Sequence, residues 1–385
     1  MNIGEVIESG GKIMRVAFIT SVISKRLGGI QNTGYYFAKC FPGNVDFSVF
    51  CSTESELDDV GCTVCKSQYK SNDTRHYHFD LLKMLFSQNR IDRFDFTFAS
   101  LYPMALECYL LKKIKKIPYG VMMHGNELMD GVQSHLIVGR IIQKVRFFIR
   151  SIILNNADVL FANSEFTKSL CESKFKNKNI QVIHPPICFE DKNILNSEKT
   201  NVIFSLGRIE KRKGFQFVVE AMEEMIKTIP NLKYYIAGAG PYEKRIKEII
   251  EEKNLQDNVI MLGRVSEDEK DFYYRLCDFF IMPSFVVEEE SSVEGFGIVF
   301  IEANMYGKYV ITTQSGGIPD AVIPGVTGNF VETENSNSIC AMLNKLYSQE
   351  FSYDSEKCIE WAKQMDISNI VNQYTNCISY LLQSR

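Results

Sequence analysis

The chain has 385 residues, of which 45% are hydrophobic and 23% charged, a usage typical of globular proteins that excludes long disorder and fibrous architectures. The length favours two domains of just under two hundred residues each. The net charge of −4 is unevenly divided: residues 1–190 carry 23 basic and 18 acidic side chains (+5), and residues 191–385 carry 20 and 29 (−9). This asymmetry indicates two surfaces with different partners.

Membrane-spanning, secreted and metal-binding classes have little support. No apolar run approaches the roughly 18 residues that a membrane span requires, and Glu5 and Glu8 occupy a region that is positive and then apolar in signal peptides. The 11 cysteines, scattered through apolar stretches, indicate reduced thiols. One C-x-x-C, Cys62 to Cys65, lacks a second pair or nearby histidines and is a weak metal or redox signal. We therefore expect a cytoplasmic protein without a metal.

Alternating short apolar runs and longer amphipathic runs predict β/α units with parallel sheets. A polar stretch from Pro185 to Thr200 is predicted to link two such units. The strands expected before this linker are Met14–Thr20, Val45–Cys51, Phe94–Ala99, Tyr119–Met123, Val159–Ala162 and Ile180–Ile183.

The pattern restarts after the linker. The strands expected there are Val202–Leu206, Tyr234–Ala237, Val259–Leu262, Phe279–Met282 and Tyr309–Thr313. The expected helices are Phe215–Thr228, Tyr242–Lys253, one near Ile298–Met305, and two terminal helices. We place the domains at residues 1–190 and 191–365, with a terminal helix at 366–385 crossing back to the first. Ligands of such doubly wound halves bind beyond the carboxyl ends of the strands, where helix N-termini also point.

Two loops of the first half carry groups suited to a ligand. Gly28 and Gly29 follow the first strand, and adjacent glycines let the backbone approach an anion at a helix start. A plain turn explains this pair equally well. His124 ends the strand Tyr119–Met123, where it faces the cleft and can bond a sugar hydroxyl or a phosphate; a loop histidine without a task is the alternative.

The loop after strand Val202–Leu206 is cationic. Basic side chains are disfavoured at a helix start, where the dipole attracts anions, so their presence predicts an anionic ligand, with a solvated charge run as the alternative. The next loop, Gly238–Pro241, is glycine-rich but lacks the full G-x-G-x-x-G fingerprint, which argues against a dehydrogenase. The cationic loop begins at Gly207 and contains Arg208, Lys211, Arg212 and Lys213.

Two glutamates, Glu294 and Glu302, flank a glycine-rich helix start. If most of this segment is helical, a rise of about 1.5 Å per residue separates them by roughly 12 Å, comparable to the span from hexose to ribose in a sugar nucleotide. The backbone N–H groups of Phe296–Ile298 would meet the sugar or diphosphate between them. Carboxylates suit polyols because each accepts two hydroxyl hydrogen bonds. A merely solvated pair of glutamates is the alternative, but the apolar run Ile298–Ile301 predicts a buried element, in which two acids are conspicuous.

These features together resemble the retaining glycosyltransferases of family 4, which have the GT-B fold: two Rossmann-like β/α/β domains facing each other across a cleft. The resemblance covers nearly the whole chain. Its most specific marks are the Glu294-to-Glu302 motif and Ser315–Asp320 in register with it, and Ser291–Glu302 is most similar to the branch that includes mannosyltransferases acting on phosphatidylinositol and other lipid-linked acceptors. The other marks are Gly28-Gly29, His124-Gly125, Ala157-Asp158 to Asn163-Ser164, Gly207-Arg208, Lys213-Gly214, Gly238–Pro241 and Leu262–Val265.

The resemblance implies a role for each matching residue. Arg208 and Lys213 would hold the diphosphate and stabilise the leaving phosphate, and Glu302 would bind the ribose hydroxyls. His124 would contact the sugar near the reacting carbon, which makes His124, Arg208, Lys213 and Glu294 the expected catalytic residues. Gly28 and Gly29 would line the phosphate side of the acceptor cleft, and Arg264 and Val265 would lie beside the base. Glu294, with the backbone of Gly295–Ile298, would hold the transferred sugar. The expected donor-binding residues are Gly28, Gly29, Gly207, Arg264, Val265, Gly295, Phe296, Gly297, Ile298 and Glu302. Nothing is transferred onto the acidic run Glu288–Glu290.

The chemistry expected of such a site needs no divalent metal. A leaving nucleoside diphosphate needs its growing charge neutralised, and preorganised cations with a helix terminus achieve this without Mg²⁺. Only His76 and His78 among the five histidines lie in a ligand spacing. Retention of configuration is implied by the resemblance alone, and either Glu294 as a nucleophile or front-face attack assisted by the leaving phosphate is compatible with it.

The sequence therefore predicts a retaining hexosyltransferase that uses a UDP- or GDP-sugar and a glycan or lipid-linked acceptor, in the biosynthesis of a cell-surface polysaccharide, lipopolysaccharide or glycolipid. The alternatives are another GT-B enzyme, such as a sugar-nucleotide epimerase or a phosphorylase, and a non-catalytic sugar-nucleotide-binding subunit. The presence of all four of Arg208, Lys213, Glu294 and Glu302 argues against the silent subunit.

The basic residues of the first half concentrate in Lys112–Lys116 and Arg140–Arg150. The second segment mixes apolar and basic residues, which predicts an amphipathic helix on an anionic membrane at its cytoplasmic face. The alternative is a domain helix that packs its apolar face on the sheet. Nucleic acid is a poorer partner, because aromatic residues do not interleave with the basic ones in a known binding pattern.

Overall fold

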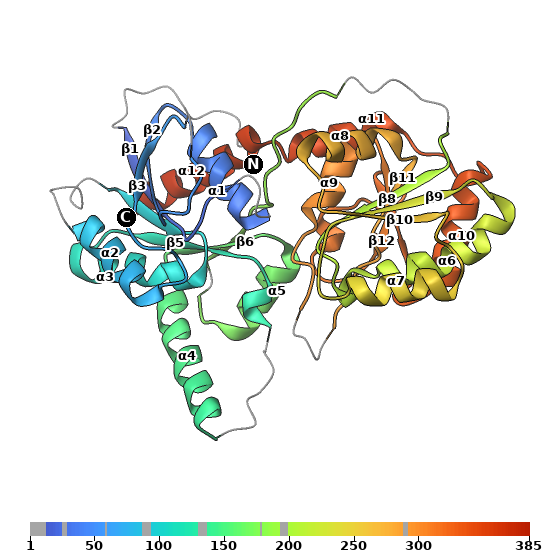
Figure 1. Cartoon of the computed structure of the whole chain (residues 1–385). Coiled ribbons are helices and arrows are strands. Elements are labelled where there is room, and N and C mark those ends of the chain that lie inside the picture. The colour runs from blue at the N-terminus through green and yellow to red at the C-terminus, as the bar shows by residue number, and fades with distance from the viewer. Residues whose placement is uncertain are drawn as a thin grey trace.

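In the computed structural model, two parallel sheets each carry helices on both faces (Figure 1). The structure describes residues 13–24, 29–57, 60–86, 94–129, 137–177, 179–192, 199–287 and 292–385. The first sheet has the order β3-β2-β1-β4-β5-β6-β7, with β1 (Met14–Ile19), β2 (Val45–Cys51), β3 (Thr63–Lys66), β4 (Phe96–Ala99), β5 (Tyr119–Met123), β6 (Val159–Ala162) and β7 (Ile180–Val182). The second has the order β10-β9-β8-β11-β12-β13, with β8 (Val202–Leu206), β9 (Lys233–Ala237), β10 (Val259–Gly263), β11 (Phe279–Ile281), β12 (Tyr309–Thr313) and β13 (Gly328–Val331).

Helices connect the strands in the right order for doubly wound sheets. Those of the first half are α1 (Gly29–Cys40), α2 (Thr74–Phe86), α3 (Ala105–Lys115), α4 (Ile137–Asn155) and α5 (Glu165–Lys174). Those of the second half are α6 (Phe215–Thr228), α7 (Glu243–Glu252), α8 (Glu267–Leu276), α9 (Ile298–Met305), α10 (Ser336–Tyr347), α11 (Ser355–Gln364) and α12 (Ile367–Gln383).

The predicted α/β architecture and its strands are confirmed, with element ends displaced by no more than two residues. The sequence prediction lacks two strands, β3 and β13, which form one edge of each sheet. β3 is half exposed, and β13 contains glycine and asparagine, two residues of low strand propensity. The expectation of two terminal helices is wrong, since α10, α11 and α12 all follow β12 in the described chain.

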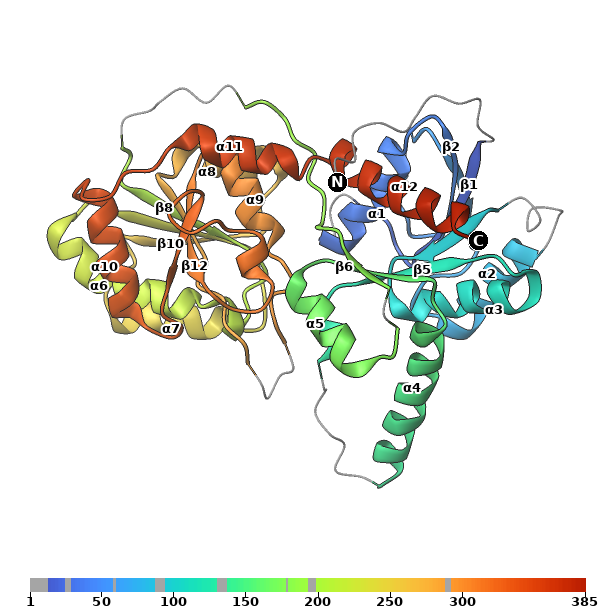
Figure 2. The same ribbon diagram turned by 180° about the vertical axis from the view of Figure 1, so that it is seen from behind.

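The chain crosses from one domain to the other twice, and the two crossing segments are hydrogen-bonded to each other. The backbone N–H of Ile187 donates to Met365 at 2.9 Å, and that of Ile367 donates back to Ile187 at 2.9 Å. After this crossing, α12 lies beside α1 in both views (Figures 1 and 2). Tyr374 of α12 packs its ring 5.0 Å from Phe37 and 4.7 Å from Phe161. The last helix therefore contributes to the core of the first sheet.

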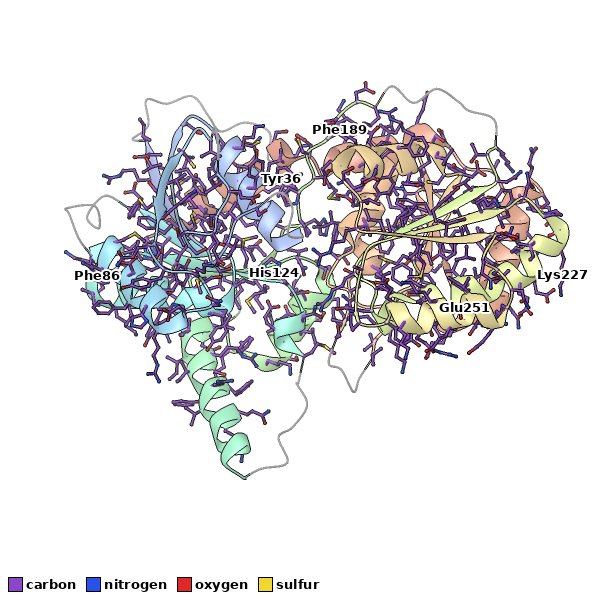
Figure 3. The ribbon with its side chains drawn as sticks, in the orientation of Figure 1. Tyr36, Phe86, His124, Phe189, Lys227 and Glu251 are labelled. Carbon is purple, nitrogen blue, oxygen red and sulfur yellow. The ribbon has the colours of Figure 1, made fainter. Side chains whose placement is uncertain are left out.

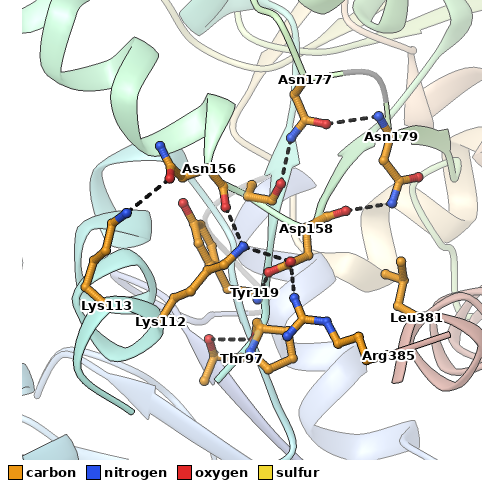
Figure 4. Close-up of polar contacts among 12 residues, drawn as sticks. Thr97, Lys112, Lys113, Tyr119, Asn156, Asp158, Asn177, Asn179, Leu381 and Arg385 are labelled. Atoms are coloured by element: carbon orange, nitrogen blue, oxygen red, sulfur yellow. Dashed lines mark hydrogen bonds and ion pairs between the residues drawn. The ribbon is translucent and has the colours of Figure 1, made fainter. Parts of the chain in front are cut away.

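Asp158, at the start of β6, joins this helix to the first sheet (Figure 4). Its carboxylate accepts the backbone N–H of Tyr119 at 2.9 Å and the ammonium of Lys112 at 2.8 Å, and it pairs with the guanidinium of Arg385. Lys112 is thereby committed to an internal ion pair, which sets it apart from the exposed lysines that follow it on α3.

Helix α4 projects from the body of the first domain (Figure 1). Among the residues of α4 whose burial is described, 143–155, those held in the core are Ile153 and Leu154 at its C-terminal end. Residues 143–149 are all exposed, so the alternative in which this helix packs its apolar face on the sheet is wrong for that stretch. Within the part of the chain that the structure describes, no helix combines the length and apolar character that crossing a membrane requires.

Candidate functional site

Loops at the carboxyl ends of the two sheets touch each other. The loop after β5 contains His124 (Figure 3), whose ring nitrogen Nε2 lies 2.8 Å from the carbonyl oxygen of Ser100 in the first domain. A Cβ atom on Gly295 would lie 2.2 Å from the carbonyl oxygen of His124, so only glycine permits this approach. The side-chain oxygen of Asn126 accepts the backbone N–H of Val293 at 3.0 Å. The first-domain loop thus contacts the segment that carries Glu294.

A second contact between the domains runs through Asp320. Its carboxylate accepts the backbone N–H of Glu165 at 2.8 Å, at the first turn of α5, and the Nε2 of His184 lies 3.1 Å away. A helix N-terminus favours a negative charge, so Asp320 adds to the side-chain cap that Ser164 supplies. The ring of His184 also stacks on Phe296, 5.0 Å away. Both domains therefore hold the loops that surround the cleft.

The cationic loop after β8 is folded around Glu294. Lys213 places its ammonium nitrogen 2.5 Å from Oε2 of Glu294, and Arg212 places a guanidinium nitrogen 3.2 Å from the same atom. The cationic side chains are each 10% exposed and the carboxylate 16%. Burial alone would raise the pKa of Glu294, but Lys213 and Arg212 hold that pKa below its ordinary value. The carboxylate is therefore ionised at neutral pH and fixed in position.

Arg208 behaves differently from its neighbours. Its side chain is 71% exposed and pairs with Glu210 at 3.1 Å. Arg212 is the arginine that reaches Glu294, because a 3-10 turn over Lys211–Lys213 turns it inward. The sequence prediction included Arg212 in the cationic loop without giving it a role. A role of Arg208 toward a diphosphate stays a prediction.

Glu302 lines a cavity of about 450 Å³ between α1, the linker, α8 and α9. Lys270 lies 3.5 Å from one of its oxygens, and the hydroxyl of Tyr274 donates to the other at 3.2 Å. Burial alone would lower the pKa of Lys270, but Glu302 and Glu267 raise it above its ordinary value, so Lys270 stays charged. Burial, and then the charge of Glu302, raises the pKa of Tyr36, which lines the same cavity from the first domain.

Two family models match the chain: Glycosyltransferase Family 4 over residues 27–190, and Glycosyl transferases group 1 over residues 189–365. The chain belongs to these glycosyltransferases. An uncharacterised glycosyltransferase of Methanocaldococcus jannaschii is 27% identical over 250 residues, which are 65% of this chain and 64% of that relative. A GDP-mannose-dependent alpha-(1-6)-phosphatidylinositol monomannoside mannosyltransferase of Mycolicibacterium smegmatis is 28% identical over 145 residues, 38% of each chain. The matches thus span less than two thirds of the length of these curated relatives.

Solved structures establish the fold. HepE of Anabaena, crystallised in complex with UDP, superimposes with a TM-score of 0.72 over 95% of this chain and 100% of its own, at 17% identity. The predicted GT-B fold is confirmed. At this level of identity the likeness carries no information about the ligand.

The other residues that were predicted to bind the donor lie around the cleft of this protein, and they do not form one cluster. Gly207 is next to Lys213, since a Cβ there would lie 3.9 Å from Cε of the lysine. Gly29 is the first residue of α1; Arg264 is exposed and Val265 half-buried after β10. Phe296 is buried, and Ile298 lines the cavity with Glu302. Gly28 and Glu288–Glu290 lie outside the described residues.

One geometric expectation for the two glutamates is corrected. Helix α9 begins at Ile298, after Gly297 at a φ of 99°. Residues 294–297 are not helical, so the rise of a helix does not set the separation of Glu294 and Glu302. The glycines 295 and 297 are needed for an irregular turn that lets the chain contact the first domain.

No three His, Cys, Asp or Glu side chains gather as a metal-binding group within the described ranges. The two histidines in a ligand spacing have separate partners. His76 pairs with Asp73 at 2.9 Å, and His78 pairs with the buried Glu107. This pairing raises the pKa of His78.

Proposed function

We propose that this protein is a retaining, metal-independent hexosyltransferase that moves a hexose from a UDP- or GDP-sugar to a glycan or lipid-linked acceptor in the cytoplasm. Membership of the family supports the reaction class. The observation that carries the proposal for this chain is the Lys213–Glu294 ion pair, which faces the His124 loop across the cleft. This pair places a cation that can bind a phosphate next to a carboxylate that can bind sugar hydroxyls.

Charge is the main requirement of the reaction. Breaking the bond from the anomeric carbon to the diphosphate leaves negative charge on the phosphate oxygens, and fixed cations stabilise that charge. Lys213 and Arg212 are held close together at 10% exposure, in a setting where electrostatic interactions are stronger than in water. When a donor binds, we expect the phosphate to take over part of the cationic contact and Glu294 to turn its oxygens to sugar hydroxyls.

The donor would extend from this pair to Glu302. Carboxylates accept hydrogen bonds from vicinal hydroxyls, so Glu302 is suited to the ribose. Lys270 and Tyr274 hold it in place. Retention requires either a covalent glycosyl intermediate on Glu294 or front-face attack, and the cations around Glu294 make that carboxylate a poor nucleophile. We therefore favour front-face attack by the acceptor.

Donor and acceptor come from a narrow range of candidates. The names of curated relatives support GDP-mannose with a phosphatidylinositol-linked acceptor, and a relative named as a colanic acid biosynthesis glycosyltransferase supports a cell-surface polysaccharide. Each of these remains a property of the relative until it is measured for this chain.

A thermal-shift panel of UDP-, GDP- and ADP-sugars tests the proposal. One nucleotide series should raise Tm, and transfer of its hexose to an acceptor should proceed equally with and without EDTA. Loss of activity in EDTA would contradict metal independence. Stabilisation by none of the donors would contradict sugar-nucleotide binding. Conversion of the sugar nucleotide into an isomer without an acceptor would indicate an epimerase, and phosphate-dependent release of a sugar phosphate from a glycan would indicate a phosphorylase.

Replacing Lys270 with methionine should raise the donor KM about tenfold, with a smaller effect on kcat. The reason is that Glu302 loses its cationic neighbour, and a hydrogen bond or ion pair to a charged group is worth roughly 1.5–3 kcal/mol. Steady-state kinetics at varied donor concentration provide the measurement, and Lys270→Arg should recover most of the loss. The matched control is Lys244→Met on α7, whose side chain is 91% exposed. An unchanged KM in Lys270→Met would exclude this role.

A further inference from the structure

The exposed apolar side chains of this protein are unevenly distributed. Among the described residues, most of the large ones lie on α2, α3 and α4: Phe79, Phe86, Ile114, Val145, Phe147, Phe148 and Ile149. In the rest of the described chain four are exposed, at scattered places: Ile13, Phe272, Ile323 and Tyr380. Monomeric proteins expose such side chains singly, whereas a gathered set indicates an interaction site.

The three helices cover the same face of the first sheet. Their inner sides pack on it through Leu81 of α2, Leu111 of α3 and Leu154 of α4, which belong to one core cluster. Helices α1 and α12 take the opposite face, as both views show (Figures 1 and 2). The outer sides of α2 and α3, together with α4, which projects from this side of the sheet (Figure 1), make up one layer on the side away from α12, and Phe86 marks its far end (Figure 3).

Helix α4 is the most exposed part of this layer. Its residues 143–149 are exposed all round, with Phe148 at 65% and Val145 at 51%. Phe147 is partly covered, because its ring stacks 6.5 Å from that of Phe175. Lys144 and Arg146 alternate with these apolar residues. A protruding helix with aromatic and basic side chains side by side matches the chemistry of an interfacial segment.

Charge on this layer has one sign. The exposed basic side chains of the three helices and of the residue that ends α3 are Arg75, Lys83, Lys113, Lys115, Lys116, Lys144 and Arg146. The helices contain just two acidic residues, and both are internal: Asp80 is bonded to Ser67, and Glu107 to His78. Outside the helices, the nearby Asp73 pairs with His76. The layer therefore complements an anionic surface.

We propose that the outer sides of α2, α3 and α4 dock on an anionic lipid bilayer, with Val145 and Phe148 entering the headgroup region and the lysines and arginines contacting lipid phosphates. Apolar burial and charge attraction add in such binding, and both depend on the composition of the bilayer. The surface belongs to the first domain alone. Docking is thus independent of whether the cleft transfers sugar, and the two proposals can fail separately.

Co-sedimentation of the full chain with vesicles tests this inference. Vesicles of phosphatidylcholine with phosphatidylglycerol should bind the protein, pure phosphatidylcholine vesicles should bind it much less, and added salt should weaken binding. The double variant Val145→Gln/Phe148→Gln should lose about tenfold in affinity, as should Lys144→Glu/Arg146→Glu. Glutamine keeps good helix propensity, and circular dichroism with a melting curve confirms that each variant is folded.

The matched controls lie on the second domain. Phe272→Gln on α8 removes an aromatic side chain that is 56% exposed, and Lys244→Glu on α7 reverses an exposed charge. Both should bind vesicles as the wild type does. Equal binding to neutral and anionic vesicles, or wild-type binding by the α4 variants, would overturn the proposal. Self-association that Val145→Gln/Phe148→Gln abolishes, without vesicle binding, would assign the surface to a second copy of the chain.

Discussion

Replacing Lys213 with methionine is expected to lower kcat/KM for the nucleotide-sugar donor by about 10²–10³-fold, the usual cost of removing one preorganised group that stabilises developing negative charge. Methionine retains the length and the apolar stem of the lysine, so the change removes mainly charge. Lys213 is the cation nearest to Glu294, at 2.5 Å, and it is almost buried. Its contribution should therefore not be replaced by water.

The same change should also affect stability, which has to be separated from catalysis. Glu294 would keep only Arg212 as a close cation, and leaving a buried charge underpaired costs about 3 kcal/mol. The double variant Lys213→Met/Glu294→Gln removes both charges, so its Tm should recover while its activity stays low. Chemical denaturation and donor kinetics on the single and double variants provide the measurements.

Lys211 is the matched control for this prediction. It belongs to the same 3-10 turn but is exposed. Lys211→Met should leave kcat/KM close to that of the wild type. If Lys213→Met transferred sugar at the wild-type rate, or if both lysine variants lost activity equally, a specific role of Lys213 would be excluded.

The sequence was sufficient to predict the elements that lie near the site, because each is an apolar run bounded by turn residues. β5, β8 and α9 have the predicted bounds. The contact of Lys213 with Glu294 could also have been predicted, since the resemblance placed both residues at one end of the second sheet. The pattern did not predict the edge strand β13, because its glycine and asparagine are not typical of a strand.

The side-chain partners could not be predicted for a physical reason. Whether Arg208 or Arg212 turns inward depends on a 3-10 turn, and 3-10 and α turns have similar sequences. Lys270 and Tyr274 are four residues apart on α8, so both face Glu302. The sequence pattern did not predict this helix, and without it nothing placed the two side chains on one face. Tyr36 reaches the same cavity from the other domain, and no local pattern encodes an approach between domains.

Replacing Gly295 with alanine is expected to lower kcat by about 10²-fold while each domain stays folded. The new Cβ would lie 2.2 Å from the carbonyl oxygen of His124 and 2.9 Å from the side-chain nitrogen of Asn163, and both of these groups belong to the first domain. The backbone oxygen cannot rotate away, so the domains must separate. A displacement of about 1 Å at the reacting groups costs rate on this scale.

Two other glycine variants serve as controls for this prediction. Gly43→Ala meets nothing within 4 Å and should behave as the wild type. Gly238→Ala would place its Cβ 1.9 Å from the carbonyl oxygen of Gly207 in the same domain, at a φ of 132°, and should therefore lower Tm. Gly295→Ala should leave Tm nearly unchanged and instead increase the radius of gyration in small-angle scattering. Wild-type kcat in Gly295→Ala would mean that transfer does not need the His124 loop against the Glu294 segment. A loss of Tm equal to that of Gly238→Ala would assign the effect to folding, because a clash between domains leaves each core intact.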